Sequence, residues 1–277
     1  MKNVKIGRKS IQKVLDKYQG EALVNFILGP YTYKENITIN ISSANFIGVE
    51  GKTKIIINKK ERKKEVLFPA STVLVLGSCI TFRNIIIESN YKQNGVSLAV
   101  FGDNIFLDNC ELISNNKSLL LGPLPKDVVE ELNESLQNVN TNYPTTTYVN
   151  KSKITGSSDY VIGAGTCFFN ECEFNNLKEG FVFETLHNSN NPNGFICNKC
   201  FFNELTSNIL VRSYSYHVSV FLIECLINKN LRPINYENHF SLNYYEYPYL
   251  KTDISEEIDK DDLEYFEFVL NNIKRKS

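Results

Sequence analysis

A short pattern that recurs along the chain constrains its fold more than any other feature. In each unit an aromatic or aliphatic residue is followed two places later by Asn, Asp or Ile, and two places after that by Cys or another small or apolar residue. The units are Phe82-Asn84-Ile86, Phe106-Asp108-Cys110, Tyr148-Asn150-Ser152, Phe168-Asn170-Cys172, Ile196-Asn198-Cys200 and the weaker Phe221-Ile223-Cys225. A period of two predicts that the members of each unit share one face of a β-strand.

Most successive units begin about twenty to thirty residues apart, which is the length of one coil of a solenoid. Stacked coils bring like residues over one another, so we expect ladders of aromatic, Asn and Cys side chains around a continuous core. The pattern therefore predicts an all-β fold, a right-handed parallel β-helix, with residues 1–277 as a single domain. The alternative is an antiparallel sandwich, which requires two-residue hairpin turns and regular polar alternation. The sequence shows little of either.

Both ends of the chain have helical patterns. Residues 8–19 carry apolar side chains at helical spacing after Ser10, a suitable N-cap, and this helix would cover the open edge of the first coil. The tail, residues 251–277, is acidic, and its apolar positions predict a helix over 258–270 that packs on the last coils. Strand-like runs occupy 23–28, 37–41, 44–47 and 54–57.

One long interval between units contains an insertion, residues 122–146. Its middle, 127–136, is amphipathic and predicts a short helix. Long loops in compact solenoids are usually functional or disordered. The insertion precedes the coil that carries Asp159, so it could form one wall of a cleft.

Composition and charge exclude several classes of protein. The net charge of -1 gives no reason to expect a nucleic-acid or membrane partner, and no segment is apolar enough to cross a bilayer. The seven Cys are odd in number and spread along strand-like segments. With no signal-peptide pattern at the start, this favours a reduced, cytoplasmic compartment, although a removed signal peptide would leave the same sequence.

Metal and redox sites find little support in the sequence. Cys197 and Cys200 have the spacing of half a metal or redox site, but no second pair follows at a zinc-like distance. Positions three apart in a strand also face opposite sides, so we interpret both as structural. The three His show no ligand spacing.

The stretch with the strongest functional character is Gly156-Ser157-Ser158-Asp159-Tyr160-Val161-Ile162-Gly163. It places one carboxylate between a glycine-bounded turn and an apolar run. Asp159 is therefore the first candidate for chemistry. The alternative is that Asp159 only forms a turn by bonding its own backbone.

Several segments, in order, resemble the pectin methylesterase (pectinesterase) family of carbohydrate esterases. They are Tyr33 to Ile37, Val96 to Leu98 with Gly102-Asp103, Asn109-Cys110, Gly122 to Pro125, Gly156 to Gly163, and Leu210 to Tyr214. The resemblance runs from Ser10 to about Tyr247. It implies a parallel β-helix with a groove on its flank for methyl-esterified galacturonan. In that groove one Asp attacks the ester, a second protonates the leaving methoxide, two Gln bind the oxyanion and an Arg holds the nucleophile.

The resemblance transfers only part of this set to the chain. Asp159 stands at the position of the nucleophile and Arg212 at that of the arginine. Lys117 occupies the position of the general acid. Asn116 and Asn94 replace the two oxyanion Gln residues, with Gln93 as the alternative to Asn94 if the register shifts by one.

Two aromatic residues flank the retained charges. Tyr214 stands where the family has Trp, and Tyr160 follows Asp159. Both could stack on sugar rings or lie inside the coil. The substitutions predict a charge cluster of Lys117, Asp159 and Arg212.

These residues support two hypotheses of different classes. The first is a pectinesterase-like enzyme that needs no metal or organic cofactor and acts as a monomer on an acidic polysaccharide or oligogalacturonide. The second is a catalytically inactive relative in which Lys117 and Arg212 bind uronate carboxylates. A purely structural solenoid is a third alternative, weakened because Asp159 and Arg212 are retained together. Lys117 is the residue at which the first two differ.

Overall fold

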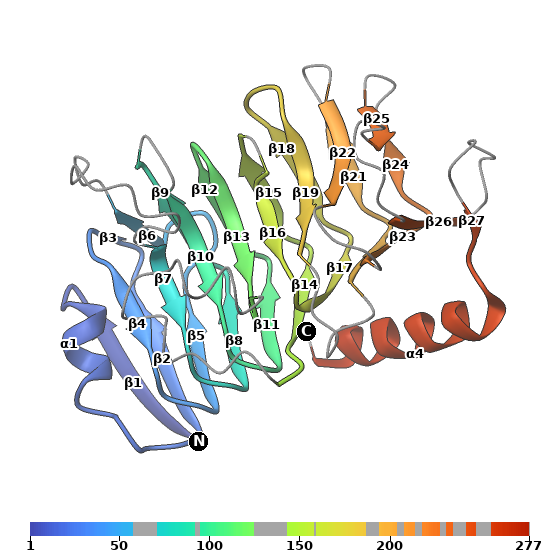
Figure 1. The fold of residues 1–277 in the computed structure, drawn as a ribbon. Coiled ribbons are helices and arrows are strands. Elements are labelled where there is room, and N and C mark those ends of the chain that lie inside the picture. Colours follow the sequence, from blue (N-terminus) through green and yellow to red (C-terminus); the bar gives the residue numbers. More distant parts are fainter. Residues whose placement is uncertain are drawn as a thin grey trace.

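The computed structural model describes residues 1–57, 71–91, 95–124, 143–157, 159–186, 194–203, 208–213, 218–227, 231–234, 242–247 and 256–276. These residues form a right-handed parallel β-helix in which successive coils add strands to three parallel sheets, here sheets A, B and C (Figure 1). The predicted fold class is confirmed. The insertion helix predicted at 127–136 lies outside the described residues.

Sheet A has eleven described strands and extends along the whole solenoid. In spatial order they are β1 (Lys2–Gly7), β2 (Val24–Leu28), β5 (Ala44–Ile47), β8 (Ile80–Arg83), β11 (Ile105–Asp108), β14 (Thr146–Asn150), β17 (Thr166–Asn170), β20 (Phe195–Asn198), β23 (Val218–Ile223), β26 (Leu242–Tyr247) and β27 (Glu256–Glu257).

Sheets B and C have eight described strands each. Sheet B contains β3 (Thr32–Tyr33), β6 (Lys54–Ile57), β9 (Ile86–Ser89), β12 (Glu111–Ser114), β15 (Lys153–Gly156), β18 (Glu173–Asn176), β21 (Phe201–Asn203) and β24 (Leu226–Ile227). Sheet C contains β4 (Ile37–Ile39), β7 (Ser71–Val75), β10 (Val96–Val100), β13 (Lys117–Leu121), β16 (Val161–Gly163), β19 (Phe181–Thr185), β22 (Asn208–Ser213) and β25 (Leu231–Ile234).

The Asn positions of the repeat form the predicted ladder in sheet A. Asn150 Nδ2 donates to Asp108 Oδ1 at 2.9 Å, Asn170 Nδ2 to Asn150 Oδ1 at 2.7 Å, and Asn198 Nδ2 to Asn170 Oδ1 at 2.8 Å. These side chains are buried, so each hydrogen bond satisfies groups that water does not reach. Arg83 Nε donates to Asp108 Oδ2 at 3.0 Å and so pairs the charged end of the ladder.

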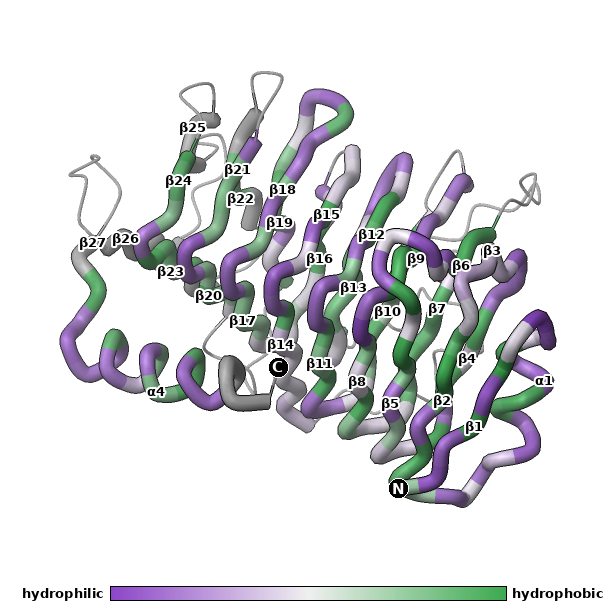
Figure 2. The backbone as a smooth tube through the Cα atoms, turned by 180° about the vertical axis from the view of Figure 1, so that it is seen from behind, coloured by the Kyte–Doolittle hydropathy of each residue, from purple (hydrophilic) through white to green (hydrophobic). Residues whose placement is uncertain are grey.

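The prediction that each unit lies on one face of a strand is wrong. Phe106 and Phe168 point outward, whereas Cys110 and Cys172 lie in the core inside the coils. The residue before each Cys, or before Ser152, adopts a positive φ of 47° to 53° and turns the chain from sheet A into sheet B. Polar segments accordingly recur at this turn in successive coils (Figure 2).

The first unit is also displaced by one residue. Phe106 pairs with Thr81, and Phe82 pairs with Leu107, so Phe82 points into the core. There it stacks on Phe46 at 5.3 Å between ring centroids, and Phe46 stacks on Phe26 at 5.1 Å. The aromatic ladder in the first coils is therefore internal.

The N-terminal end of the solenoid is closed by α1 (Ile11–Leu15) together with β1, a strand that the sequence did not suggest. Ser10 is the N-cap, as predicted, and the Glu35 carboxylate accepts from Ile11 N at 2.7 Å and Gln12 N at 3.2 Å. The Gln12 amide accepts from Thr38 N at 2.7 Å and donates to Thr38 O at 3.3 Å. The side chain thereby occupies the place of a further strand beside β4.

The C-terminal helix α4 (Lys260–Lys276) packs against the outer face of sheet A. Phe266 is 1% exposed and contacts Phe168 and Phe221, with ring centroids 6.2 and 4.7 Å apart. Figure 1 shows α4 running back from the last strands along the solenoid. The predicted packing of the acidic tail on the last coils is confirmed.

All seven cysteines are described and carry free thiols. Burial raises the pKa of Cys110 to about 12 and that of Cys197 to about 11. Cys197 and Cys200 lie in the core, as expected of structural residues. In the described part of the chain no group of three metal-ligating side chains occurs, and no helix is long and apolar enough to span a membrane.

Candidate functional site

The candidate site lies on the outer face of sheet C. One row of paired residues crosses four neighbouring strands, namely Leu120, Ile162, Glu184 and Arg212. The residues on either side of this row point into the core, for example Leu119, Val161 and Phe183. Arg212 belongs to this row, Lys117 is the first residue of β13, and Asn116 and Asp159 lie just before β13 and β16.

Backbone hydrogen bonds align the segment around Lys117 with the segment around Asp159. Ser157 N donates to Asn116 O at 3.1 Å, and the Tyr160 carbonyl accepts from Ser118 N at 2.7 Å and Leu119 N at 2.9 Å. Lys117 and Asp159 lie between these bonds. Leu119 pairs with Val161, and Lys117 and Asp159 lie two residues before Leu119 and Val161, respectively, so they occupy equivalent positions on neighbouring coils. The structure thus brings Asn116, Lys117 and Asp159 together on adjacent coils.

A row of hydroxyl groups anchors the start of three sheet C strands. Thr72 Oγ1 donates to Glu88 O at 2.9 Å, Ser97 Oγ to Ile113 O, and Ser118 Oγ to Thr155 O at 2.6 Å. Each bond joins a sheet C strand to sheet B of the next coil. The bond from Ser118 fixes the residue that follows Lys117.

Asp159 adopts an uncommon backbone conformation. Its φ is +51°, which Asp tolerates better than most residues, and its side chain is 9% exposed. Such conformations cost of order 1–3 kcal/mol and cluster at functional sites. The turn is tight because a Cβ on Gly156 would lie 2.1 Å from Tyr160 Cβ.

The interpretation of Tyr160 as a sugar-binding residue needs correction. Its side chain is 0% exposed and belongs to the core inside the coils. The positive φ of Asp159 turns the chain so that the ring packs over Gly156. Tyr160 therefore supports the site from below, and a sugar cannot reach its ring in this arrangement.

The ion pair that the structure describes for Lys117 is with Glu184, a residue that was not predicted. Lys117 Nζ lies 3.9 Å from Glu184 Oε2, and the two side chains are 20% and 10% exposed. The predicted cluster of Lys117, Asp159 and Arg212 did not include this carboxylate, and the contacts among those three side chains stay a prediction. The signal available in the sequence was a single acidic residue within the apolar run Phe181–Thr185.

The remaining predicted site residues are described in part or not at all. Arg212 pairs with Glu184 through the backbone of β22 and β19, and its side chain is not described. Asn94 and Tyr214 lie outside the described residues. Asn116 is half-buried, and its backbone carbonyl binds Ser157 N.

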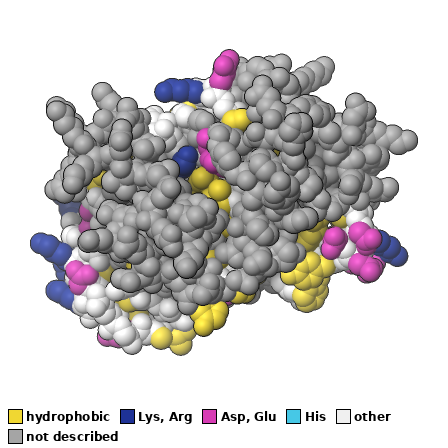
Figure 3. Space-filling view, viewed as in Figure 1, with side chains coloured by type: hydrophobic (Ala, Val, Ile, Leu, Met, Phe, Trp, Pro, Cys, Tyr) yellow, Lys and Arg dark blue, Asp and Glu magenta, His cyan; other side chains and the backbone are white. Residues whose placement is uncertain are grey.

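The site thus combines two largely buried carboxylates with one ammonium group. Figure 3 shows the face of the molecule seen in Figure 1, where one basic and one acidic side chain lie next to each other beside hydrophobic side chains. The neighbouring apolar cluster includes Leu120 and Ile162 from the same row. A carboxylate in such surroundings can act as a nucleophile, and the ammonium group can donate a proton or bind an anion.

Sequence comparison finds relatives for part of the chain. No protein-family model matches it. Two pectinesterases, from Ralstonia solanacearum and Ralstonia nicotianae, are 29% and 28% identical to it over 134 residues. The match covers 45% of this chain and 30% of each relative, so it spans less than a third of their length.

Solved structures match almost the whole chain. Pectin methylesterase from carrot has a TM-score of 0.74 at 14% identity, covering 95% of this chain and 90% of that one. PemA from Erwinia chrysanthemi has a TM-score of 0.73 at 11% identity and 94% coverage of both chains. A pectin methylesterase in complex with a hexasaccharide has a TM-score of 0.71 at 11% identity, covering 91% and 89%.

Together these likenesses define the class of fold as the parallel β-helix of the pectin methylesterases. With the partial sequence match to the two Ralstonia pectinesterases, the chain is similar to pectinesterases in part of its sequence and to pectin methylesterases in its fold.

Proposed function

We propose that this protein is a carbohydrate esterase that hydrolyses methyl esters of a galacturonan-type polysaccharide or oligosaccharide, with Asp159 as the nucleophile. The observation that carries the proposal is the alignment of the Lys117 and Asp159 segments by the hydrogen bonds of Asn116 and Tyr160. It supports a site in which a nucleophile and a proton donor face one ester. The pectin methylesterases of the same fold, one of them in complex with a hexasaccharide, support the class of substrate.

The reaction has two steps. An Asp159 carboxylate oxygen bonds to the ester carbonyl carbon, and the bond to the methoxy oxygen breaks as that oxygen takes a proton from the Lys117 ammonium group. Methanol leaves, and the acyl group is held on Asp159 as an anhydride. Water then attacks the anhydride carbonyl carbon of the sugar acid, gives one proton to Lys117 and breaks the bond to Asp159, which leaves as a carboxylate; the released uronic acid loses the second proton to solvent. Arg212 and Asn116 are the groups proposed to hold Asp159 and the oxyanion.

Glu184 gives the site a preference for esters in this mechanism. Its side chain is 10% exposed and lies against Lys117. By pairing with Lys117, Glu184 offsets the positive charge that would attract a free uronate carboxylate, whereas the neutral methyl ester does not depend on that charge. We expect product to be held less tightly than substrate for this reason.

A second candidate function is binding of acidic carbohydrate without catalysis. The observation that favours it is Lys117 itself, an ammonium group in an ion pair where the resemblance places a carboxylic acid. In this case the cation contributes affinity for uronates and no proton transfer.

Methanol release from methyl-esterified polygalacturonan distinguishes the two functions. Asp159→Asn is the suitable knockout, because Asn tolerates the positive φ that would strain Ala. Release by wild type and its loss in Asp159→Asn is the expected result. If wild type is silent and Lys117→Asp releases methanol, the protein is a catalytically inactive relative, as the second function requires, and the proposed esterase is refuted. If neither releases methanol, the proposed esterase is refuted.

A further inference from the structure

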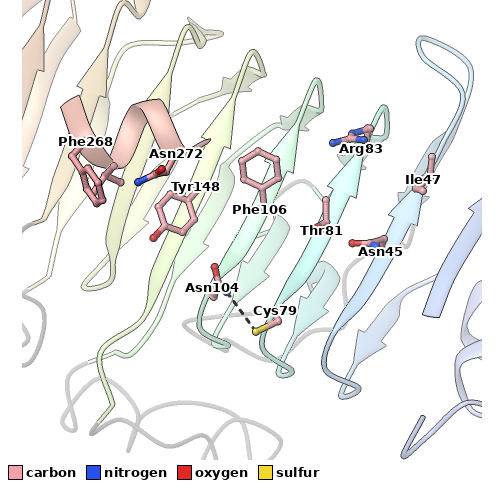
Figure 4. Close-up of a pocket in the computed structure, with 11 residues that line it drawn as sticks. Asn45, Ile47, Cys79, Thr81, Arg83, Asn104, Phe106, Tyr148, Phe268 and Asn272 are labelled. Carbon is pink, nitrogen blue, oxygen red and sulfur yellow. Dashed lines mark hydrogen bonds between the residues drawn. The ribbon is translucent and has the colours of Figure 1, made fainter. Parts of the chain in front are cut away.

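A groove separate from the Asp159 site lies between α4 and the outer face of sheet A. Its volume is about 720 Å³, within the usual range of ligand sites of about 300–1,000 Å³. Its floor is a row of paired residues on four neighbouring strands, Asn45, Thr81, Phe106 and Tyr148 (Figure 4). The Asp159 site lies on sheet C, so the groove and that site are on different sheets.

The groove begins where the character of this row changes. From Phe106 through Phe168 to Phe221 the row is apolar and packs with α4 residues such as Phe266. From Thr81 to Asn45 it is polar, and the α4 residues Phe268 and Asn272 lie at the opposite end of the groove, beside Tyr148 (Figure 4). The groove therefore has aromatic rings at one end and hydroxyl and amide groups at the other.

The polar end is held in a defined orientation. Asn45 Nδ2 donates to Asn25 Oδ1 at 2.8 Å, which fixes the amide. Arg83 is the one charged side chain among the described lining residues, and its Nε donates to Asp108 Oδ2 at 3.0 Å. The ion pair offsets the positive charge, so the groove does not select a strongly charged ligand.

The wall that α4 contributes carries an exposed aromatic side chain, and the packing of the helix on sheet A does not account for its position. Phe268 is 67% exposed and lines the groove, whereas its helix neighbour Phe266 is buried. Tyr148, on the floor, stacks on Phe168 at 5.6 Å with an interplanar angle of 14°. The ring of Tyr148 is thereby held in one orientation.

We propose that this groove binds a short oligosaccharide made of neutral or methyl-esterified sugar rings. Sugars present apolar C–H faces, which aromatic side chains cover, and hydroxyl groups, which amides and hydroxyls bind. The row from Asn45 to Tyr148 crosses three strand spacings, about 14 Å, which gives an extended ligand several contacts. That the ligand belongs to the polymer attacked at Asp159 rests on the proposed function, but binding itself does not.

Cys79 supplies a local measure of occupancy. It lines the groove, and it is the one exposed cysteine of the seven, all of which are described. The rate at which a maleimide alkylates Cys79 is measured in Asp159→Asn protein with and without methyl-esterified hexagalacturonide. We expect the oligosaccharide to slow alkylation. In the Phe268→Ala variant, the oligosaccharide concentration that halves the alkylation rate should rise about fivefold, because binding is weaker.

Tyr265→Ala is the matched control, because Tyr265 is 49% exposed on the same helix and does not line the groove. In this variant the oligosaccharide should protect Cys79 from alkylation as well as it does in the Asp159→Asn parent. The proposal is overturned if the hexagalacturonide does not slow alkylation of Cys79, or if Phe268→Ala and Tyr265→Ala lose protection equally. It is also overturned if a hydrophobic dye protects Cys79 and the hexagalacturonide does not. Methanol release by wild type is measured in parallel, so that absence of a groove ligand and absence of esterase activity are scored separately.

Discussion

Lys117 Nζ lies 3.9 Å from Glu184 Oε2, although β16 separates the strands that carry the two residues. The long Lys117 side chain therefore reaches across about 10 Å of sheet C, passing the strand that follows Asp159. Both side chains are mostly shielded from water. The pair connects the coil before the candidate nucleophile to the coil after it.

The first prediction concerns the energy of this pair. Removing one charge leaves the other poorly solvated, so we expect Glu184→Gln to lower the free energy of unfolding by about 1–3 kcal/mol. Lys117→Met should have a similar effect. The double variant should cost less than the sum of the singles by about 1 kcal/mol, measured by urea unfolding. Strictly additive effects would show that the pair does not contribute to stability.

The second prediction concerns Gly156 in the turn before Asp159. A Cβ there would lie 2.1 Å from Tyr160 Cβ and 2.8 Å from Ser118 Oγ. We expect Gly156→Ala to destabilise the fold by about 1–3 kcal/mol and to displace Asp159. Gly51→Ala is a control, because nothing lies within 4 Å of its Cβ, although its φ of +65° adds strain. A Gly156→Ala protein no less stable than Gly51→Ala would contradict the packing described.

The third prediction concerns the Asn ladder. Asn170 donates to Asn150 and accepts from Asn198, and all three are buried. Asn170→Ala leaves two buried polar groups without partners, which should cost about 2–4 kcal/mol. Asn203→Ala removes one bond to Asn175 near the surface and should cost less than about 1 kcal/mol. Equal losses of unfolding free energy in the two variants would count against a special role for the buried ladder.

The fourth prediction separates the two faces of α4. Phe266 is 1% exposed between Phe168 and Phe221, so Phe266→Ala should lower the free energy of unfolding by about 3–5 kcal/mol. Phe268 is 67% exposed, and Phe268→Ala should change it by less than about 0.5 kcal/mol. Thermal or urea unfolding tests both. A small effect of Phe266→Ala would mean that α4 is dispensable for stability.

The sequence was informative wherever residues interact with the same position of the next coil. The spacing of Asp108, Asn150, Asn170 and Asn198 was enough to predict their ladder. The repeat pattern predicted the wrong face of the strand for Phe82. The Asn of this unit lies in the turn after β8 and not in the strand, so its position does not determine which face the aromatic residue two places earlier occupies. Asn84 has a φ of +57° and is such a turn residue.

Other features depended on contacts that no local pattern contains. The strand β1 has one buried side chain, Ile6, so it lacks a strand's alternation. Glu184 gains significance only because Lys117 reaches it across β16. The inward position of Tyr160 follows from the backbone turn at Asp159, and nothing in the residue order distinguishes it from an outward one.

The contact between Gln12 and Thr38 has a consequence for how separate molecules meet. The terminal strands of a solenoid have unpaired backbone N–H and C=O groups, with which a strand of another molecule can form hydrogen bonds and extend the sheet. By bonding both Thr38 N and Thr38 O, one glutamine occupies docking points of β4 that a foreign strand would need. Replacing Gln12 with Ala would leave these backbone groups open to such a strand, and the first sign should be end-to-end fibres rather than an unfolded chain.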